Sequence, residues 1–182
     1  MQNNRHNQRG LTLLELLITT GILMITITLT LPSLTSVVGN NQLNATTDTL
    51  RKAITLVRAE SIKRGHRVVG CLSDKPDACN SSRPLQLLVF SDRDRTGDPT
   101  TTGDLIKIVE LDYPTITTSY NRSYLAFSPL GYASGTNGTF KVCHRNGQGE
   151  LLVISTLGRI RKAVDYDGDG LVEKTPGTPI TC

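Results

Sequence analysis

The chain has 182 residues, a formal net charge of +4 and an aromatic content of 4%, with no tryptophan. This length allows one globular domain beside a short further segment and excludes two full domains, while the weak net charge means that any electrostatic function must come from local clusters. The sequence has no Gly-x-Ser-x-Gly motif, no metal-spaced pair of histidines and no phosphate-binding glycine loop, so it predicts a protein that is not an enzyme.

The chain begins with a short basic segment that is followed by a long apolar one. Residues 1–10 contain Arg5 and Arg9 and no acid, whereas residues 11–31 contain one charge, Glu15. A helix of about 20 residues is about 30 Å long, which is the thickness of the hydrocarbon core of a membrane. The pattern therefore predicts a single membrane span with a cytoplasmic N-terminus and the rest of the chain across the membrane.

A small residue, Gly10, lies before the apolar segment, whereas a secretory signal carries its cleavage site after it. A carboxylate inside a membrane needs a partner. Cleavage after Gly10 would create an amine at Leu11, with which Glu15 of a neighbouring subunit would pair. A plain signal anchor of a periplasmic protein is the alternative interpretation.

Gly10-Leu11-Thr12-Leu13-Leu14-Glu15 resembles the class III signal of type IV pilins and pseudopilins, although Leu11 replaces the usual Phe. The resemblance implies that residues 1–10 are a leader removed by prepilin peptidase, that Leu11 is N-methylated, and that Glu15 supports filament assembly with other pilins. It also implies an inner-membrane protein with a periplasmic domain before assembly and an extracellular pilus afterwards. Pro32 falls where many pilins carry a helix-kinking proline.

Beyond Pro32 the helical pattern continues to about residue 64, with Gly65 as the expected C-cap and an apolar stripe at Leu43, Thr47, Leu50, Ile54, Val57 and Ser61. Basic residues lie opposite and beside this stripe, at Arg51, Lys52, Arg58, Lys63, Arg64 and, just past the helix end, Arg67. We interpret them either as a solvated helix face or as a contribution to an anion-binding site. Residues 11–35 are the expected transmembrane and filament-core half of the helix.

After Gly65 the apolar period changes towards two. The expected strands are residues 67–71, 85–90, 105–111, 124–127, 139–143 and 151–156. A long helix followed by short antiparallel strands indicates an α+β fold. We expect a globular domain over residues 36–163 and an acidic C-terminal tail over residues 164–182.

All four cysteines follow the apolar segment and are therefore expected in an oxidising compartment. Three disulfide pairings are possible. We favour Cys71 with Cys79, across a short loop around Pro76, and Cys143 with Cys182, which would hold the C-terminal tail. A zinc site would need closely spaced pairs of ligands, which this sequence lacks.

The order of these segments resembles the FimT and FimU minor pilins and the GspH pseudopilins. The matching stretches are residues 58–65, 89–94 with 97–98, 127–131 and 158–162. The resemblance covers the chain from Gly10 to about residue 163. It implies the type IV pilin-like fold, in which a long N-terminal helix packs on antiparallel β-sheets.

The most informative motif is Gly158-Arg159-Ile160-Arg161-Lys162. If it continues the last strand, Arg159 and Arg161 lie on one face about 7 Å apart, a spacing that suits successive phosphates of a nucleic acid. Lys162 would add a third charge, and Arg145 or the basic helix end would add more if the fold brings them close. In FimT-type minor pilins a Gly-Arg-x-Arg motif binds DNA, and the resemblance implies this role for Arg159 and Arg161.

Two functions are compatible with these features. The first is a minor pilin that binds extracellular double-stranded DNA, without sequence specificity, for uptake in natural transformation. The alternative is a structural minor pilin or type II secretion pseudopilin that primes filament assembly without binding DNA. The first requires exposed, unpaired arginines, while the second allows them to be paired with Asp165 or Asp167 or buried against a neighbouring subunit.

Asp165, Asp167 and Asp169 follow the basic motif with the spacing of a calcium-binding loop. The twelfth position is Pro176 instead of Glu, which excludes an EF-hand. A looser calcium site is a weak alternative to a turn-rich acidic tail, and no other cofactor is expected.

Overall fold

The structure is a computed structural model that describes residues 12–79, 84–99, 104–111, 113–133, 135–168, 172–173, 178 and 180–182. For residues 29–36 it describes the backbone only. The chain divides into two units, residues 1–38 and residues 39–182. The predicted leader, the cleavage site Gly10 and the methylation site Leu11 lie outside the described residues.

Helix α1, Leu13–Arg64, continues past Pro32, and Gly65 ends it with a φ of +67°. In the first unit the apolar side chains between Leu13 and Ile27 are exposed. No helical stretch within the described residues is both long enough and apolar enough to cross a membrane. The span expected at residues 11–31 starts at a residue outside the described part of the chain and stays a prediction.

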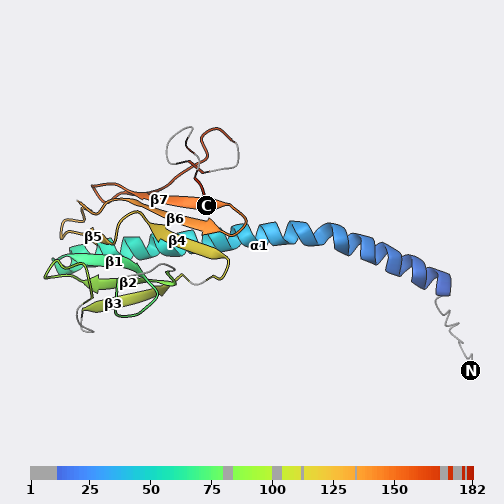
Figure 1. Ribbon diagram of the computed structural model, residues 1–182, viewed down its shortest axis with the longest axis horizontal. Helices are drawn as coiled ribbons and strands as arrows, with labels where there is room; N and C mark the ends of the chain where they lie inside the picture. The colour runs from blue at the N-terminus through green and yellow to red at the C-terminus, as the bar shows by residue number, and fades with distance from the viewer. Residues whose placement is uncertain are drawn as a thin grey trace, which may run out of the picture. The chain divides into compact units, whose positions relative to one another are not determined.

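The second unit contains the C-terminal part of α1 and two four-stranded antiparallel sheets (Figure 1). The first sheet has the order β3-β2-β1-β5, and the second has the order β4-β6-β7-β8. Their strands are β1 Val68–Ser73, β2 Gln86–Ser91, β3 Leu105–Glu110, β4 Ile116–Tyr120, β5 Leu125–Phe127, β6 Thr139–His144, β7 Gly149–Ile154 and β8 Ile160–Lys162. This arrangement confirms the predicted α+β class.

Six of these strands lie within two residues of their predicted bounds, whereas β4 and β8 were not predicted. Strand β4 is a sheet edge of mostly polar residues, and only Thr118 is buried. Such a strand lacks the apolar alternation on which sequence-based recognition depends. Strand β8 has three residues, which is too short for a periodic signal.

Leu50, Ile54 and Val57 of α1 are fully buried and form the main core with apolar side chains of both sheets. A smaller cluster lies around Val69, Leu88 and Phe90, and Tyr124 and Cys79 pack against it. Strands β1 and β2 are therefore nearly continuous buried runs, because both of their faces are covered.

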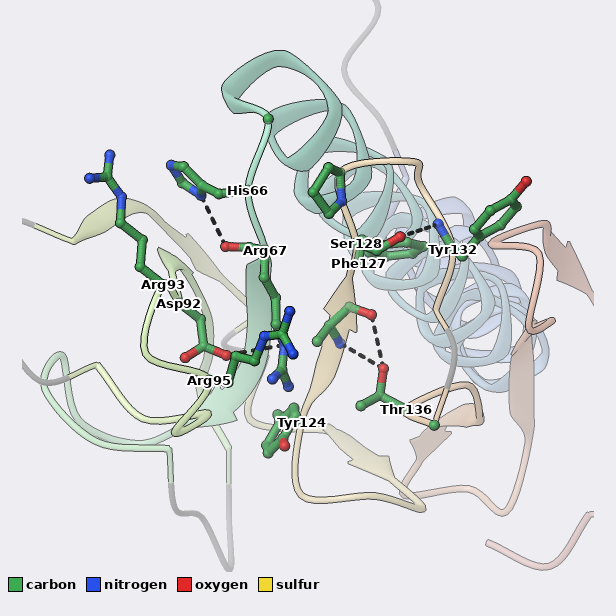
Figure 2. A pocket seen from close by; sticks show the side chains of 14 residues that line it. His66, Arg67, Asp92, Arg93, Arg95, Tyr124, Phe127, Ser128, Tyr132 and Thr136 are labelled. Carbon is green, nitrogen blue, oxygen red and sulfur yellow. Dashed lines mark hydrogen bonds and ion pairs between the residues drawn. The ribbon is translucent and has the colours of Figure 1, made fainter.

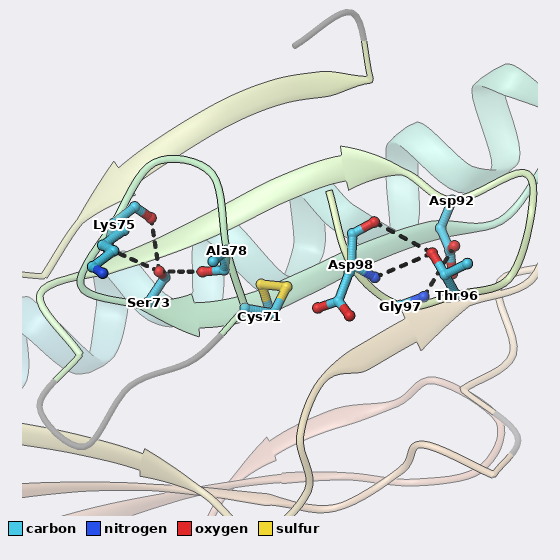
Figure 3. Close-up of a disulfide and its surroundings, with 9 residues drawn as sticks. Cys71, Ser73, Lys75, Ala78, Asp92, Thr96, Gly97 and Asp98 are labelled. Atoms are coloured by element: carbon cyan, nitrogen blue, oxygen red, sulfur yellow. Dashed lines mark hydrogen bonds between the residues drawn. A yellow bond between two sulfur atoms is a disulfide. The ribbon is translucent and has the colours of Figure 1, made fainter. Parts of the chain in front are cut away.

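The disulfides are Cys71–Cys79 and Cys143–Cys182, the pairs that the sequence favours. In the loop closed by the first of them, the Ser73 hydroxyl accepts the Lys75 N–H and donates to the Ala78 carbonyl oxygen (Figure 3). The second joins β6 to the C-terminal residue. A side chain on Gly149 would collide with Cys182, since an added Cβ would lie 2.4 Å from its Sγ.

Tyr120 should make the free energy of unfolding depend on pH in the alkaline range. Its ring stacks on Phe140 at 3.9 Å between centroids, and its hydroxyl donates to the Thr136 carbonyl oxygen at 2.5 Å. Burial raises the pKa of Tyr120, although Arg122 acts in the opposite direction. Above about pH 10 the unfolded chain loses this phenolic proton while the folded chain keeps it, so the free energy of unfolding should fall by about 1.4 kcal/mol per pH unit.

Urea unfolding between pH 9 and about pH 11.5 measures this fall, across the range in which tyrosine ionises. We expect Tyr120→Phe to be less stable at pH 9 and to have a shallower pH slope, because Phe has no proton to lose. An identical slope in both proteins would contradict the assignment to Tyr120.

Candidate functional site

The Gly-Arg-x-Arg motif lies in a tight turn and the strand after it, and it does not continue β7. The chain reverses after β7: the Ser155 N–H donates to the Arg159 carbonyl oxygen at 3.0 Å, and the Gly158 N–H donates to the Ser155 carbonyl oxygen at 2.8 Å. Gly158 has a φ of +77°. This is the left-handed position that a three-residue hairpin loop requires, so the motif does not meet the condition of continuing the strand before it.

The turn is packed tightly against its neighbours. A Cβ on Gly158 would lie 2.2 Å from the Gly131 carbonyl oxygen and 3.0 Å from Cε1 of Phe127. From α1, Nη1 of Arg58 donates to the Gly158 carbonyl oxygen at 3.2 Å. Gly158 thus lets the motif sit directly on another turn of the domain and on the last turns of the helix.

Arg159 and Arg161 are exposed. Arg161 pairs with Val153 across β7 and β8, while Ile160 between the arginines packs against the main core. Side chains alternate along a strand, so Arg161 points to the outer face of the second sheet. Within the described part of the chain, neither guanidinium has a hydrogen-bond or ion-pair partner.

Lys162 does not join the two arginines. Its Nζ lies 2.6 Å from Oε2 of Glu150 and 3.2 Å from Oδ1 of Asn44 on α1. It therefore points to the helix side of the sheet, opposite to Arg161, and Glu150 compensates its charge. Lys162, which we expected to add a third charge, is therefore paired, because in a strand the next residue after Arg161 faces the other way.

The basic face of α1 contributes to this region instead. Asn44 contacts Lys162, and Arg58 contacts Gly158. These two helix residues therefore lie next to the two ends of segment 158–162. Arg51 is exposed and is seven residues from each of them, on the same helix face. Arg51 therefore lies on the helix face that meets segment 158–162. The seven-residue spacing is visible in the sequence, but only the two contacts show which helix face meets the motif.

Arg145 lies elsewhere. It follows β6, in the connection to the start of β7, whereas the Gly158 turn follows the end of β7. Its Nη2 donates to the Pro114 carbonyl oxygen at 3.4 Å. Arg145 is therefore at the opposite end of β7 and does not extend the candidate site.

Residues 165–168, at the start of the acidic tail, form a turn after β8. Oδ1 of Asp165 accepts the Gly168 N–H at 2.7 Å, and Oε2 of the buried Glu173 accepts the Tyr166 N–H at 3.3 Å. No group of three potential metal-ligating side chains occurs among the residues that the structure describes, and Asp169 lies outside them. The calcium site at Asp165, Asp167 and Asp169 remains a prediction.

Glu15 lies in the first turn of α1. Its N–H donates to the Thr12 hydroxyl at 3.2 Å, which is the geometry of an N-cap. The capping-box pattern Thr12-x-x-Glu15 is the sequence signal for this helix start. The role of Glu15 in filament assembly stays a prediction.

Comparisons with known proteins identify the family. Residues 46–158 match the model of the type II transport protein GspH, and residues 5–31 match the prokaryotic N-terminal methylation motif. No curated protein matches the chain. Arg159 and Arg161 lie just beyond the matched residues.

Two crystal structures of the type IV minor pilin FimU of Pseudomonas aeruginosa, in space groups P21 and P65, resemble this chain with a TM-score of 0.50 and 19% identity. The similarity covers 67% of this chain and 88% and 93% of the two FimU chains, and at this identity it shows the fold alone. Pilins and pseudopilins are structural proteins, so the chain is not an enzyme. The chain belongs to the GspH family, the group of minor pilins and pseudopilins that share the type IV pilin fold.

Proposed function

We propose that this minor pilin or pseudopilin binds double-stranded DNA through Arg159 and Arg161 and takes part in DNA uptake. The observation that carries the proposal is the exposure of both guanidiniums, Arg159 just before the edge strand β8 and Arg161 within it, with no partner within the described residues. Two unpaired guanidiniums two residues apart favour an anionic, extended ligand.

The two guanidiniums are suited to contacts with the phosphate backbone of DNA and not to recognition of base edges. Guanidinium groups make bidentate, charge-assisted hydrogen bonds with phosphate oxygens. Such contacts carry no sequence information. Binding through them should be independent of sequence and should weaken steeply as salt rises, because each neutralised phosphate releases a condensed counterion.

The test is a titration of the full chain, with disulfides formed and in a non-ionic detergent, against a short random-sequence DNA duplex at several salt concentrations. We expect Arg159→Gln/Arg161→Gln to weaken binding by at least about 100-fold, since each charged hydrogen bond contributes about 1.5–3 kcal/mol. The slope of log K against log salt should become shallower by about 2, one unit for each lost phosphate contact.

Lys107→Gln/Arg122→Gln is the matched control. It also removes two exposed positive charges, from β3 in the other sheet and from the loop after β4. We expect it to retain the affinity of the unmodified protein to within a few-fold, because distant surface charges are screened. Equal losses in both double variants would indicate a general charge effect and would reject a site at the motif.

The alternative is a subunit that primes filament assembly and has no ligand beyond its neighbours. Leu130 and Leu157 favour it, because they are 74% and 68% exposed on two turns that touch through Gly131 and Gly158. Exposed apolar side chains that lie together commonly mark a protein interface. Loss of filaments in Leu130→Ser/Leu157→Ser, together with no DNA binding by the unmodified chain, would select this alternative.

Both functions need the same N-terminal processing, which we propose from the match of residues 5–31 to the methylation motif. Prepilin peptidase cuts after Gly10, Leu11 becomes the methylated N-terminus, and Glu15 pairs with the Leu11 amine of a neighbouring pilin. The protein is then held in the inner membrane before assembly and lies in the filament afterwards. N-terminal sequencing of the mature chain tests the cleavage site.

A further inference from the structure

A second cluster of arginines lines a pocket at the C-terminal end of α1. The pocket has a volume of about 610 Å³ and lies between Gly65, the loop after β2 and the segment after β5. Arg67, Arg93 and Arg95 line it, whereas Asp92 is the one acidic residue among its described lining residues. Arg67 and Arg95 both belong to the lining, and Figure 2 shows Arg67 above the ring of Tyr124.

Arg67 is held in place by its surroundings. Its Nε lies 3.2 Å from Oδ2 of Asp92, whose side chain is fully buried, and its guanidinium carbon lies 5.3 Å from the centroid of the Tyr124 ring. The Arg67 side chain is 20% exposed. Two sides of the guanidinium are therefore fixed, while the part that faces the pocket is accessible to a ligand.

Arg95 reaches the pocket from a loop with unusual backbone geometry. It has a φ of +62°, the only positive value for a non-glycine residue in the described chain. Oδ1 of Asp92 closes the same loop by accepting the Gly97 N–H at 3.2 Å (Figure 3). Gly97 packs closely on Tyr124, since an added Cβ would lie 2.3 Å from the ring. A left-handed arginine costs about 1–2 kcal/mol, and such strained residues concentrate at binding sites.

We propose that this pocket binds a phosphate group, carried by a nucleic-acid backbone or free in solution. Asp92 compensates one arginine, so Arg93 and Arg95 leave the lining positively charged until an anion enters. Arg67 provides a fixed donor for phosphate oxygens, and Arg95 provides a second, exposed donor in the lining of the same pocket. The site does not depend on DNA binding by Arg159 and Arg161. It is nevertheless close to them, since Phe127 lines the pocket and also contacts the Gly158 turn.

The test measures binding of inorganic phosphate to the full chain by broadening of the ³¹P resonance, with chloride added to keep the ionic strength constant. We expect saturable binding that is weakened by about tenfold or more in Arg95→Asn, because a charged hydrogen bond is lost. Asparagine tolerates the left-handed backbone, so this variant should fold. Arg122→Asn, which removes an exposed charge outside the pocket, should bind phosphate like the unmodified chain.

A second titration uses the DNA duplex with the same variants and identifies the source of the phosphate. Reduced DNA affinity in Arg95→Asn, with Arg159 and Arg161 intact, would assign the pocket to a nucleic-acid phosphate. Unchanged DNA affinity together with lost phosphate binding would assign it to free phosphate. The proposal is overturned if phosphate binding does not saturate, or if Arg95→Asn and Arg122→Asn bind phosphate equally. Neither result depends on whether the motif itself binds DNA.

Discussion

Replacing Gly158 with alanine should destabilise the globular unit by about 2–5 kcal/mol, the largest effect that we expect from adding a single methyl group. Two costs add. The φ of +77° is unfavourable for any residue with a Cβ, and that Cβ would lie 2.2 Å from the Gly131 carbonyl oxygen. The colliding atom belongs to the backbone, so no side-chain rotation can relieve the contact.

Gly135→Ala is the matched control for this variant. Gly135 has a φ of +80°, but an added Cβ would meet nothing within 4 Å. It should therefore cost about 1–2 kcal/mol, the backbone term alone. Urea unfolding followed by circular dichroism compares the two. Equal losses would show that the Gly158 turn can move away from Gly131, and that glycine is needed there for its φ only.

Removing the Asp92 carboxylate should have a comparable effect, about 3 kcal/mol for Asp92→Ala. Asp92 is fully buried, compensates Arg67 and accepts the Gly97 N–H. Alanine would leave the arginine charge unpaired beside an apolar wall and would free the loop that carries Arg95. Because Arg67 is 20% exposed, water can partly solvate it, and the expected cost lies at the lower end of the range for a broken buried pair.

A double-mutant cycle separates the charge from the loop contact. Asp92→Ala/Arg67→Met should recover part of the loss, because no unpaired charge remains. Asp94→Ala is the control in the same loop, since Asp94 is exposed and accepts hydrogen bonds from Thr96 at the surface. It should cost less than about 1 kcal/mol. A loss as large for Asp94 as for Asp92 would contradict the role that we give to the buried pair.

Much of the fold follows from local patterns in this chain. The apolar stripe from Leu43 to Val57 predicts the buried face of α1, and Gly65 predicts its end, because each depends only on residues within a few turns. Residue order allows three disulfide pairings, and the structure contains the favoured one. Strand β4 could not be predicted in this way, since its stability comes from pairing with β6 and from the stacking of Tyr120 on Phe140.

The features of the candidate site also separate into those that local sequence determines and those that long-range packing determines. Residue order alone determined that the chain carries a pilin-type N-terminal motif, a long helix, a set of short strands and the pair Arg159 and Arg161. Tertiary structure alone decided that the motif turns back at Gly158, that Lys162 faces Glu150, and that Arg67 and Arg95 meet in one pocket. The physical reason is the sequence separation of the interacting residues. Helices, turns and the alternation of side chains along a strand depend on neighbours in sequence. The charge at a site depends on distant residues, which only the packing of the fold brings close to it.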